Sequence, residues 1–344
     1  MTPSVALFGA SGYAGALCAR LLHRHPAFML TTVTARSDVG RRVDELYPQH
    51  RVPMRLEELE VERHADVDAA IVAYPHGAAA ELVAELRRRG VRVVDLSADF
   101  RLRDAAVYEE WYRAHPAPEL LGEAVYGLPE HYRDEIAGAS LVANPGCYPT
   151  AAILGLAPLA RAGVIADVIV DAKSGVSGAG RGATDATHFV SVTENMNAYS
   201  VPRHRHTPEI EQELAVLGAE RPITFTPHLI PLDQGELVTC YVTPADGGLS
   251  SQDARAIYLE AYADEPFVEV VSAPPGVRGV RETNLCRVSV HIDERTGRII
   301  VFSVIDNLWK GTASQAVQNL NLMFGLPEDE GIGPTRSRTR EVVR

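Results

Sequence analysis

One cysteine stands where a thiol could act as a nucleophile. Cys147 lies in "NPGCYPTAA", between a Pro-Gly pair and a Tyr-Pro pair. The preceding run "SLVAN" predicts a short buried strand, and the following run "TAAILGLAPLARAG" predicts a helix that begins near Thr150. A helix N-terminus and nearby cations can lower the pKa of a cysteine below its free value of about 8.5. We therefore expect a largely ionised thiolate at a strand-to-helix corner.

Two histidines offer the acid-base group that such a thiolate would need. His204 and His206 lie on one predicted loop, in "RHRHTPEIEQ", directly before a predicted helix. An imidazole can donate or accept a proton at a carbonyl oxygen near neutral pH. A histidine before a helix can equally be a cap or a surface residue, so the residues alone leave the role of this pair open.

A glycine loop near the N-terminus predicts a nucleotide site. Residues 4–8, "SVALF", alternate as a strand and lead through Gly9, Gly12 and Gly15 of "GASGYAG" into a helix. Glycine lets the backbone approach a pyrophosphate, and the helix N-terminus supplies N–H donors and a positive dipole end. Such turns also occur for packing alone, so the loop by itself is a moderate signal.

The end of the next predicted strand indicates which dinucleotide would bind. The strand "LTTVTA" ends at Arg36 and Ser37, where an NAD-specific site would place an acidic residue on the ribose 2′-hydroxyl. Arginine and serine suit a 2′-phosphate instead. The sequence therefore predicts NADP(H).

A cysteine nucleophile combined with a nicotinamide site limits the chemistry to oxidation or reduction through a thioester. A good leaving group such as phosphate would complete the reaction. Arg101, in "DLSADFRL" at a predicted strand end, could bind that phosphate because a guanidinium offers paired donors.

Strands and helices alternate through the first part of the chain, which predicts a Rossmann-like doubly wound parallel sheet of the α/β class over residues 1–146. From residue 147 to 307 the predicted strands suggest a mainly antiparallel sheet with helices on one face, an α+β catalytic domain. The final helix "TASQAVQNLNLMFG" is expected to return residues 308–344 to the first domain, ending in a basic, solvated tail.

Composition excludes several classes of protein. The chain has 344 residues, 46% of them apolar, and a formal net charge of −12, which argues against a nucleic-acid partner. No apolar run is long enough to span a membrane, and the first residues leave no room for a signal segment, so we expect a cytoplasmic protein. Cys18, Cys240 and Cys286 lie in apolar patterns that predict buried, inert thiols. Their spacing suggests neither disulfides nor a metal site.

The ordered motifs "GASGYAG", "AYPHG", "DLSADFRL", "NPGCYPTAA", "KSGVSGAG", "HRHTPEI" and "DNLWKGTASQAVQN" resemble those of N-acetyl-γ-glutamyl-phosphate reductases of arginine biosynthesis. The resemblance covers nearly the whole chain. Tyr74 and Ser314 depart from the family pattern, where leucine and glycine are usual.

The resemblance implies NADPH-dependent reduction of N-acetyl-γ-glutamyl phosphate to N-acetyl-L-glutamate 5-semialdehyde, in a homodimer or homotetramer related in plan to aspartate-semialdehyde dehydrogenase. It implies Cys147 as the nucleophile, and we favour His206 over His204 as the acid-base group. Residues assigned to NADP(H) are Gly9, Ser11, Gly12, Tyr13, Gly15, Arg36, Ser37, Pro75, Ser97, Ser177, Gly178 and Asn307. Residues assigned to the substrate are Arg101, Asn144, Lys173 and Lys310.

The two lysines support a separate hypothesis. Of the 33 basic residues only Lys173 and Lys310 are lysines, so the other 31 are arginines. In such a chain a lysine marks a position where a guanidinium does not fit or function. We therefore expect both ammonium groups to serve the site, against the alternative of chance and a buried stem.

Two other functions remain open from the sequence. The first is the related reductase that acts on an aminoadipyl phosphate, often bound to a small carrier protein. The second is a redox-sensing module that binds NADP without turnover, although such a module has no need of a cysteine and a histidine from two segments.

Overall fold

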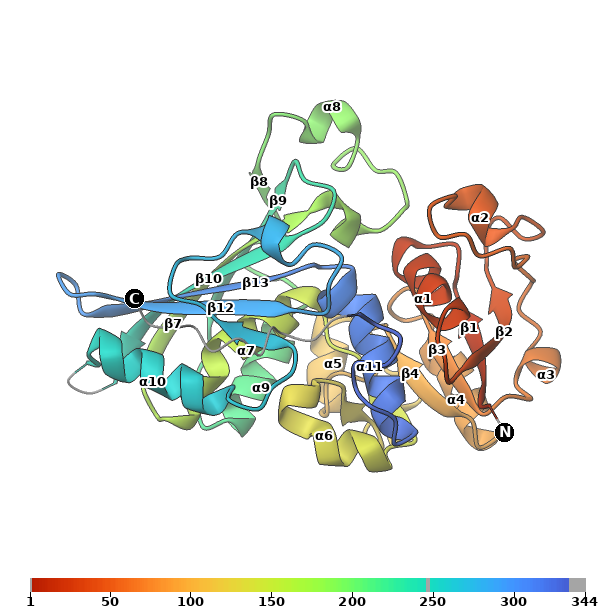
Figure 1. Cartoon of the computed structure of the whole chain (residues 1–344), viewed down its shortest axis with the longest axis horizontal. Helices are drawn as coiled ribbons and strands as arrows, with labels where there is room; N and C mark the ends of the chain where they lie inside the picture. The colour runs from red at the N-terminus through yellow and green to blue at the C-terminus, as the bar shows by residue number, and fades with distance from the viewer. Residues whose placement is uncertain (1, 246–247, 334–344) are drawn as a thin grey trace.

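The computed structural model describes residues 2–245 and 248–333, which form two β-sheets joined by their helices (Figure 1). The basic tail predicted at 335–344 lies outside the described residues.

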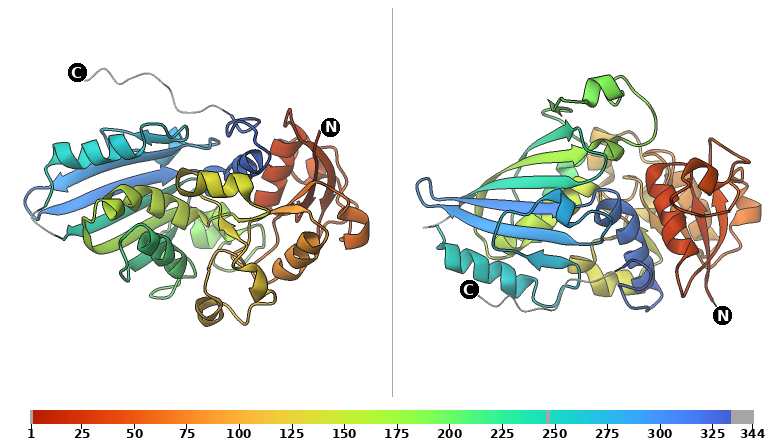
Figure 2. Two further views of the ribbon diagram at one scale, coloured as in Figure 1. Left: turned by 90° about the horizontal axis from the view of Figure 1, so that it is seen from below. Right: turned by 45° about the horizontal axis from the view of Figure 1, so that its top comes forward.

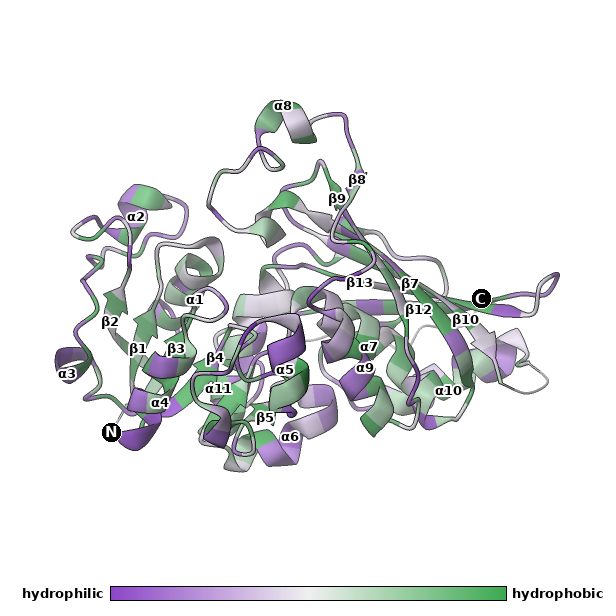
Figure 3. Ribbon diagram, turned by 180° about the vertical axis from the view of Figure 1, so that it is seen from behind, coloured by the Kyte–Doolittle hydropathy of each residue, from purple (hydrophilic) through white to green (hydrophobic). Residues whose placement is uncertain are grey.

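The first sheet is parallel throughout, in the order β2-β1-β3-β4-β6-β5. Its strands are β1 (Ser4–Phe8), β2 (Met29–Thr34), β3 (Ala69–Val72), β4 (Arg92–Asp95), β5 (Val125–Tyr126) and β6 (Leu141–Ala143). Strands β3 and β6 are buried along their whole length, as expected for a parallel sheet covered on both faces, and Figure 3 shows β3 as mainly hydrophobic. The predicted Rossmann-like sheet is confirmed.

Alternate residues of β1 enter different hydrophobic clusters on the two faces of this sheet. Leu7 packs with residues of helix α1 (Tyr13–His23), whereas Phe8 packs with residues of helix α4 (Ala80–Arg88). The remaining helical elements of this part are α2 (Val43–Leu46), α3 (Val61–His64), α5 (Ala105–Trp111), η1 (Pro118–Leu120) and α6 (Pro129–Gly138).

The second sheet has the order β11-β12-β13-β10-β7-β9-β8 and is mainly antiparallel, although β9 runs parallel to β7 and β11 parallel to β12. Its strands are β7 (Ile165–Gly175), β8 (Asn197–Ala198), β9 (Thr224–Ile230), β10 (Glu236–Pro244), β11 (Val268–Val270), β12 (Cys286–Asp293) and β13 (Arg298–Ile305). The other elements between Cys147 and the end of β13 are α7 (Cys147–Arg161), η2 (Val176–Ala179), α8 (Phe189–Val192), α9 (Thr207–Val216), α10 (Ser251–Ala261) and η3 (Val277–Gly279).

Helices α7, α9 and α10 cover one face of the second sheet. Val170 and Val238 form one buried cluster with Leu154 of α7, Leu214 of α9 and Tyr258 of α10. This arrangement matches the predicted α+β domain.

The chain then crosses back between the two sheets (Figure 2). A π-helical turn, η4 (Trp309–Ala313), contacts both α1 and α7, and α11 (Ser314–Met323) packs against α1, α6 and β4. Such π-turns are frequent at functional sites.

Helix boundaries differ from the sequence prediction at the cysteine. Helix α7 begins at Cys147 rather than near Thr150, because Gly146 is still extended and Pro149, which has no N–H, is tolerated in the first turn. No helix in the described part of the chain combines the length and apolar character needed to cross a membrane.

Candidate active site

The three glycines of the first loop differ in the space that the structure leaves for a side chain at each position. Gly9 has φ +99°, and a Cβ there would lie 2.5 Å from the Ala73 carbonyl oxygen. A Cβ at Gly15 would lie 2.1 Å from the Gly9 carbonyl oxygen, so this glycine lets α1 pack on the turn. Gly12, the N-cap of α1, has open space within 4 Å of its Cβ position. The open backbone at a helix N-terminus fits a pyrophosphate.

Exposed donors follow strand β2 beside this loop. Arg36 and Ser37 are both exposed, and the Arg36 guanidinium lies 4.7 Å from the centre of the Tyr74 ring. The hydroxyl oxygens of Ser37 and Ser11 are 3.3 Å apart. A guanidinium held on an aromatic face next to two hydroxyls fits a 2′-phosphate. Tyr13 begins α1, and its ring packs edge-on against Tyr47 at 6.2 Å.

Arg181, which the sequence analysis missed, connects the second domain to this edge of the first. Its Nη1 donates to Asp38 Oδ2 at 2.5 Å and to the Ser11 carbonyl oxygen at 3.3 Å. The bond to Arg181 lowers the pKa of Asp38, so the carboxylate stays charged. The only sequence signal was an arginine within the glycine-rich run "SGAGRG".

Cys147 is the first residue of α7, and its surroundings are tight. A Cβ at Gly311 of η4 would lie 2.7 Å from Cys147 Cβ, and a Cβ at Gly146 would lie 2.5 Å from His206 Nε2. All four cysteines lie in the described part of the chain. Cys18, Cys240 and Cys286 are buried, as predicted, whereas Cys147 is partly exposed.

The expected thiolate is not supported by the surroundings of Cys147. Burial, followed by the charge of Glu236, raises the pKa of Cys147 well above its ordinary value. The Tyr148 backbone and the Arg101 charge act in the opposite direction but do not overcome burial. The free protein therefore holds a thiol, and the prediction of a largely ionised thiolate was wrong.

The structure brings both histidines near the cysteine corner, because the ring centres of His204 and His206 lie 5.8 and 5.9 Å from that of Tyr148. His206 precedes α9, its Nε2 faces Gly146, and its Nδ1 has no hydrogen-bond partner among the described residues. Burial and its positive neighbours hold the pKa of His206 well below 6.5, so the ring is neutral and able to accept a proton. His204 Nδ1 accepts from the His206 backbone N–H at 3.1 Å.

Glu209, also missed, connects α9 to the cysteine corner. One oxygen accepts from the Gly146 backbone N–H and from the Tyr126 hydroxyl, each at 2.9 Å, and the other pairs with Arg101 at 3.3 Å. The sequence signal was present in "HTPE", because His206 and Glu209 are three residues apart and thus neighbours at the start of one helix.

The guanidinium of Arg101 is buried and already hydrogen-bonded within the protein, so it is not available to bind a phosphate. The side chain is 5% exposed, and it donates to the carbonyl oxygens of Asn144 and Leu96, each at 2.8 Å, as well as to Glu209. We therefore correct the predicted phosphate clamp: Arg101 braces the strand end before the cysteine and contributes positive charge.

Three other predicted residues differ in exposure. Asn144 is fully buried, donates to the Thr312 carbonyl oxygen and accepts from Asn319, so it holds η4 rather than facing substrate. Ser97 is buried, and its hydroxyl donates to Asp95 at 2.6 Å. Pro75, after β3, is exposed.

The predicted cofactor residues of the second domain form one hydrogen-bonded group. Asn307 Nδ2 donates to Ser177 Oγ at 3.0 Å, and Asn307 Oδ1 accepts from the Gly235 backbone N–H at 2.8 Å. A Cβ at Gly178 would lie 3.1 Å from Ser174 Oγ. This group fixes the start of β10.

Neither lysine lies where the sequence hypothesis placed it. Lys310 has no exposed surface, and its ammonium donates to Glu130 at 2.6 Å and to Gln318 at 3.1 Å, inside the protein. Lys173 lies within β7 and donates to Asp171 at 2.5 Å. Local ion pairs already hold both ammonium groups, so the structure gives no support to their assignment to substrate binding.

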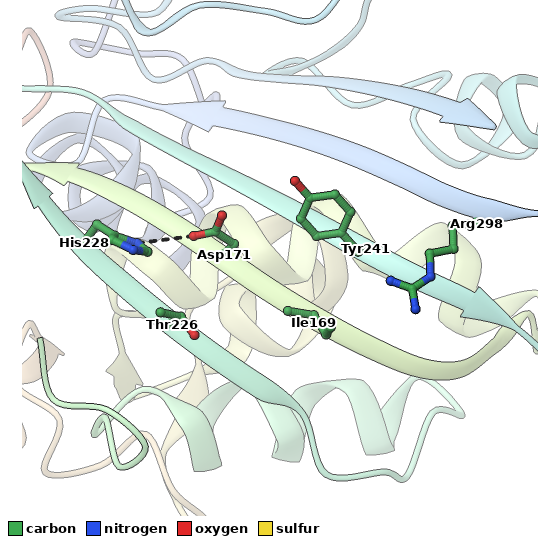
Figure 4. Close-up of a pocket in the computed structure, with 6 residues that line it drawn as sticks. All are labelled: Ile169, Asp171, Thr226, His228, Tyr241 and Arg298. Atoms are coloured by element: carbon green, nitrogen blue, oxygen red, sulfur yellow. Dashed lines mark ion pairs between the residues drawn. The ribbon is translucent and has the colours of Figure 1, made fainter. Parts of the chain in front are cut away.

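Asp171 belongs to the face of the second sheet that the helices leave uncovered (Figure 4). A concavity of about 410 Å³ on this face is lined by Ile169, Asp171, Thr226, His228, Tyr241 and Arg298. It lies across the sheet from α7. Among the described residues no group of three His, Cys, Asp or Glu side chains could hold a metal ion.

Together, a dinucleotide loop on a parallel sheet, an α+β domain, and a cysteine with a neutral histidine between them define an oxidoreductase of the semialdehyde dehydrogenase class. Two family models match the chain: "Semialdehyde dehydrogenase, NAD binding domain" over residues 4–139 and "Semialdehyde dehydrogenase, dimerisation domain" over residues 147–307.

Solved structures show the same fold. Aspartate semialdehyde dehydrogenase II of Vibrio cholerae has a TM-score of 0.71 at 18% identity, with 94% of this chain and 99% of that chain covered. Aspartate semialdehyde dehydrogenase of Candida albicans, solved with NADP, has a TM-score of 0.68 at 14% identity over the same shares of the two chains.

Curated relatives identify the family within this class. N-acetyl-gamma-glutamyl-phosphate reductase of Desulforudis audaxviator is 50% identical over 95% of this chain and 97% of its own length. The enzyme of that name from Pelotomaculum thermopropionicum is 49% identical over 97% of this chain and 99% of its own length. The chain belongs to the N-acetyl-gamma-glutamyl-phosphate reductase family, which confirms the prediction from the seven motifs.

Proposed function

We propose that this chain reduces N-acetyl-γ-glutamyl phosphate to N-acetyl-L-glutamate 5-semialdehyde with NADPH and releases phosphate, as a step of arginine biosynthesis. The observation that carries the proposal is the placement of Cys147 at the N-terminus of α7, directly after Gly146, whose Cβ position lies 2.5 Å from Nε2 of the neutral His206 ring. The name shared by relatives at about half identity supports the substrate.

Cys147 acts first. The thiol gives its proton to a neighbouring basic group as the sulfur attacks the acyl carbon of the substrate. A C–S bond forms, and the C–O bond to phosphate breaks with its electrons on the phosphate oxygen. The product of this step is a thioester on Cys147. Arg101 contributes a buried positive charge near the sulfur, which favours the thiolate.

Bound NADPH supplies the hydride that reduces the thioester. The residues fitted to hold the cofactor are those of the glycine loop, where Gly12 leaves space, and the exposed Arg36 and Ser37. Because these two replace an acidic residue, the site favours NADP(H) over NAD(H).

His206 manages the proton at the carbonyl oxygen. A neutral imidazole with an unpartnered Nδ1 can take up a proton from solvent, donate it to the carbonyl oxygen as the hemithioacetal forms on Cys147, and take it back from that oxygen as the C–S bond breaks. Breaking of the C–S bond then releases the semialdehyde and returns the sulfur. Tight packing of Gly311 and Gly146 around the cysteine helps to exclude water, which would hydrolyse the thioester.

Self-association and location belong to the same proposal. The matched model is described as a dimerisation domain, and the sheet face of Figure 4 is uncovered in the single chain. We propose that copies associate as a homodimer or homotetramer in the cytoplasm. Sedimentation velocity of the purified chain measures this association.

One assay separates the proposed function from its alternatives. Oxidation of the semialdehyde is measured with phosphate and NADP, once with the glutamyl and once with the aminoadipyl chain length. Turnover of the N-acetyl-glutamyl substrate alone is the expected result. Preference for the longer chain would indicate the related reductase, and NADP binding without turnover would indicate a redox-sensing module.

A further inference from the structure

A carboxyl group that no step above uses lies beside the nucleophile. Glu236, the first residue of β10, has no exposed surface, and neither of its oxygens makes a hydrogen bond of full geometry with any described residue. Burial of an unpaired carboxylate is costly, so this group is held either neutral or next to something that exchanges a proton with it.

Backbone geometry aims this side chain at the start of α7. Glu236 pairs with Ser174 of β7 on one side and with Ile305 of β13 on the other. Alternation places its side chain on the same face as Val238 and Cys240, the face that α7 covers. The preceding residue is fixed by the bond from Gly235 to Asn307.

Cys147 is the group that Glu236 meets there. Each acts on the pKa of the other: the carboxylate raises that of the thiol, and hydrogen bonding from the thiol and from Ser174 opposes the rise that burial causes in Glu236. The other charged or titratable groups around the pair are Arg101, Tyr148, Tyr199 and Asp306. None of these four is a better proton acceptor, because each is a cation, a phenol or a carboxyl group already accepting backbone N–H bonds.

We propose that Glu236 accepts the proton of the Cys147 thiol as the sulfur attacks, and this inference rests on the proposed nucleophilic role of Cys147. The S–H bond breaks, an O–H bond forms on Glu236, and the freed electron pair of sulfur forms the C–S bond. When the semialdehyde leaves, sulfur takes the proton back and Glu236 is again a carboxylate. The cycle needs no other reactant.

The acidity of the pair suits this exchange. Burial raises the pKa of Glu236 to about 8, close to the pH at which a proton acceptor works best. Once protonated, the group is neutral and no longer opposes the charge on sulfur. His206, whose ring lies against Gly146, is then left for the carbonyl oxygen, so the two protons of the reaction are handled by two groups.

Alkylation of Cys147 by iodoacetamide tests the shared proton without any substrate. The rate is followed by peptide mapping across about pH 6 to 10 in the parent protein, in Glu236→Gln and in Glu211→Gln. Glu211 of α9 is the matched control, because its pKa is also raised by burial but its carboxylate accepts from the Ile223 backbone N–H. The parent and Glu211→Gln should level off near pH 8, where Glu236 ionises, whereas Glu236→Gln should rise through this range without a plateau. A parent profile without a plateau overturns the proposal, even if the variant does not fold.

Steady-state kinetics tests the transfer itself. Near pH 7, where Glu236 is still mostly protonated, Glu236→Gln should alkylate within about twofold of the parent. At about pH 8.5, where Glu236 of the parent is ionised and can accept the proton, kcat/KM of Glu236→Gln should be at least about tenfold lower than that of the parent. Unchanged kcat/KM overturns the proposal. So does a fall in kcat/KM with the plateau retained, because a merely structural role gives that result. Absence of reductase activity in the parent would overturn the proposed function instead, and the alkylation profile still reports on Glu236.

Discussion

Glu209 Oε1 accepts a hydrogen bond from the Gly146 backbone N–H at 2.9 Å, so the helix that follows His206 is tied to the residue before Cys147. The same carboxylate neutralises Arg101, and both side chains are almost fully buried. The spacing of sulfur and imidazole, which come from segments about sixty residues apart in the sequence, thus depends on one buried acid.

Substitution of Glu209→Gln should disturb both activity and stability. The amide keeps the shape but leaves the buried Arg101 without its counter-charge, which should lower the free energy of unfolding by about 3 kcal/mol. We expect kcat/KM to fall at least about tenfold, and chemical denaturation and steady-state kinetics measure the two effects. Glu110→Gln, from the exposed pair with Arg203, is the control and should change stability by less than about 1 kcal/mol. Parental kinetics in Glu209→Gln would show that the connection is not needed.

Addition of one methyl group at Gly311 should displace the nucleophile. The new Cβ would lie 2.7 Å from Cys147 Cβ, so either the π-turn or the cysteine must move. Gly311→Ala should lower both kcat/KM and the alkylation rate of Cys147 at least about tenfold. Gly122→Ala, where no atom lies within 4 Å of the added Cβ, should leave both unchanged. Equal effects of the two substitutions would contradict the tight contact.

Cofactor preference should follow Arg36. The parent enzyme is expected to favour NADPH over NADH, and Arg36→Asp should reduce that preference because a carboxylate repels the 2′-phosphate and can accept from a ribose hydroxyl. The ratio of kcat/KM for the two cofactors measures it. Arg295→Asp, in the exposed β12–β13 turn, is the charge-matched control. Equal kcat/KM for both cofactors in the parent would refute the assignment.

Substitution of Lys310 should lower stability, and substitution of Lys173 should leave activity unchanged. Lys310→Met leaves Glu130 buried without its partner and should lower the free energy of unfolding by about 3 kcal/mol, measured by chemical denaturation. Lys173→Arg, on the uncovered sheet face, should keep kcat/KM within about twofold of the parent. A tenfold loss of kcat/KM in a normally stable Lys173→Arg protein would restore the sequence hypothesis.

Features set by local backbone chemistry were predictable from the sequence. Gly9 and Gly15 each answer a requirement that only a residue without a side chain meets, whereas Gly12 leaves open space at the start of α1. The corner at Cys147 was predictable because strand, Pro-Gly pair and helix follow one another in the sequence.

Features that depend on long-range partners were not predictable. Lys310 is neutralised by Glu130, which lies 180 positions away in the sequence, and Arg101 is neutralised by Glu209, which lies 108 positions away. Neither the rarity of lysine nor the position of Arg101 in its motif could reveal that these charges were already paired. The pKa of Cys147 was misjudged for the same reason: its helix position is visible in the sequence, but its burial against Glu236 is not.

The central claim is that Cys147 carries the acyl group, and trapping of the acyl-enzyme tests it most directly. Enzyme is mixed with N-acetyl-γ-glutamyl phosphate without NADPH, quenched in acid and mapped by peptide mass spectrometry. The peptide containing Cys147 should gain the mass of one N-acetyl-glutamyl group, and Cys147→Ser should gain none. An adduct on a different residue, or no adduct in an enzyme that turns over normally when NADPH is added, would contradict the account.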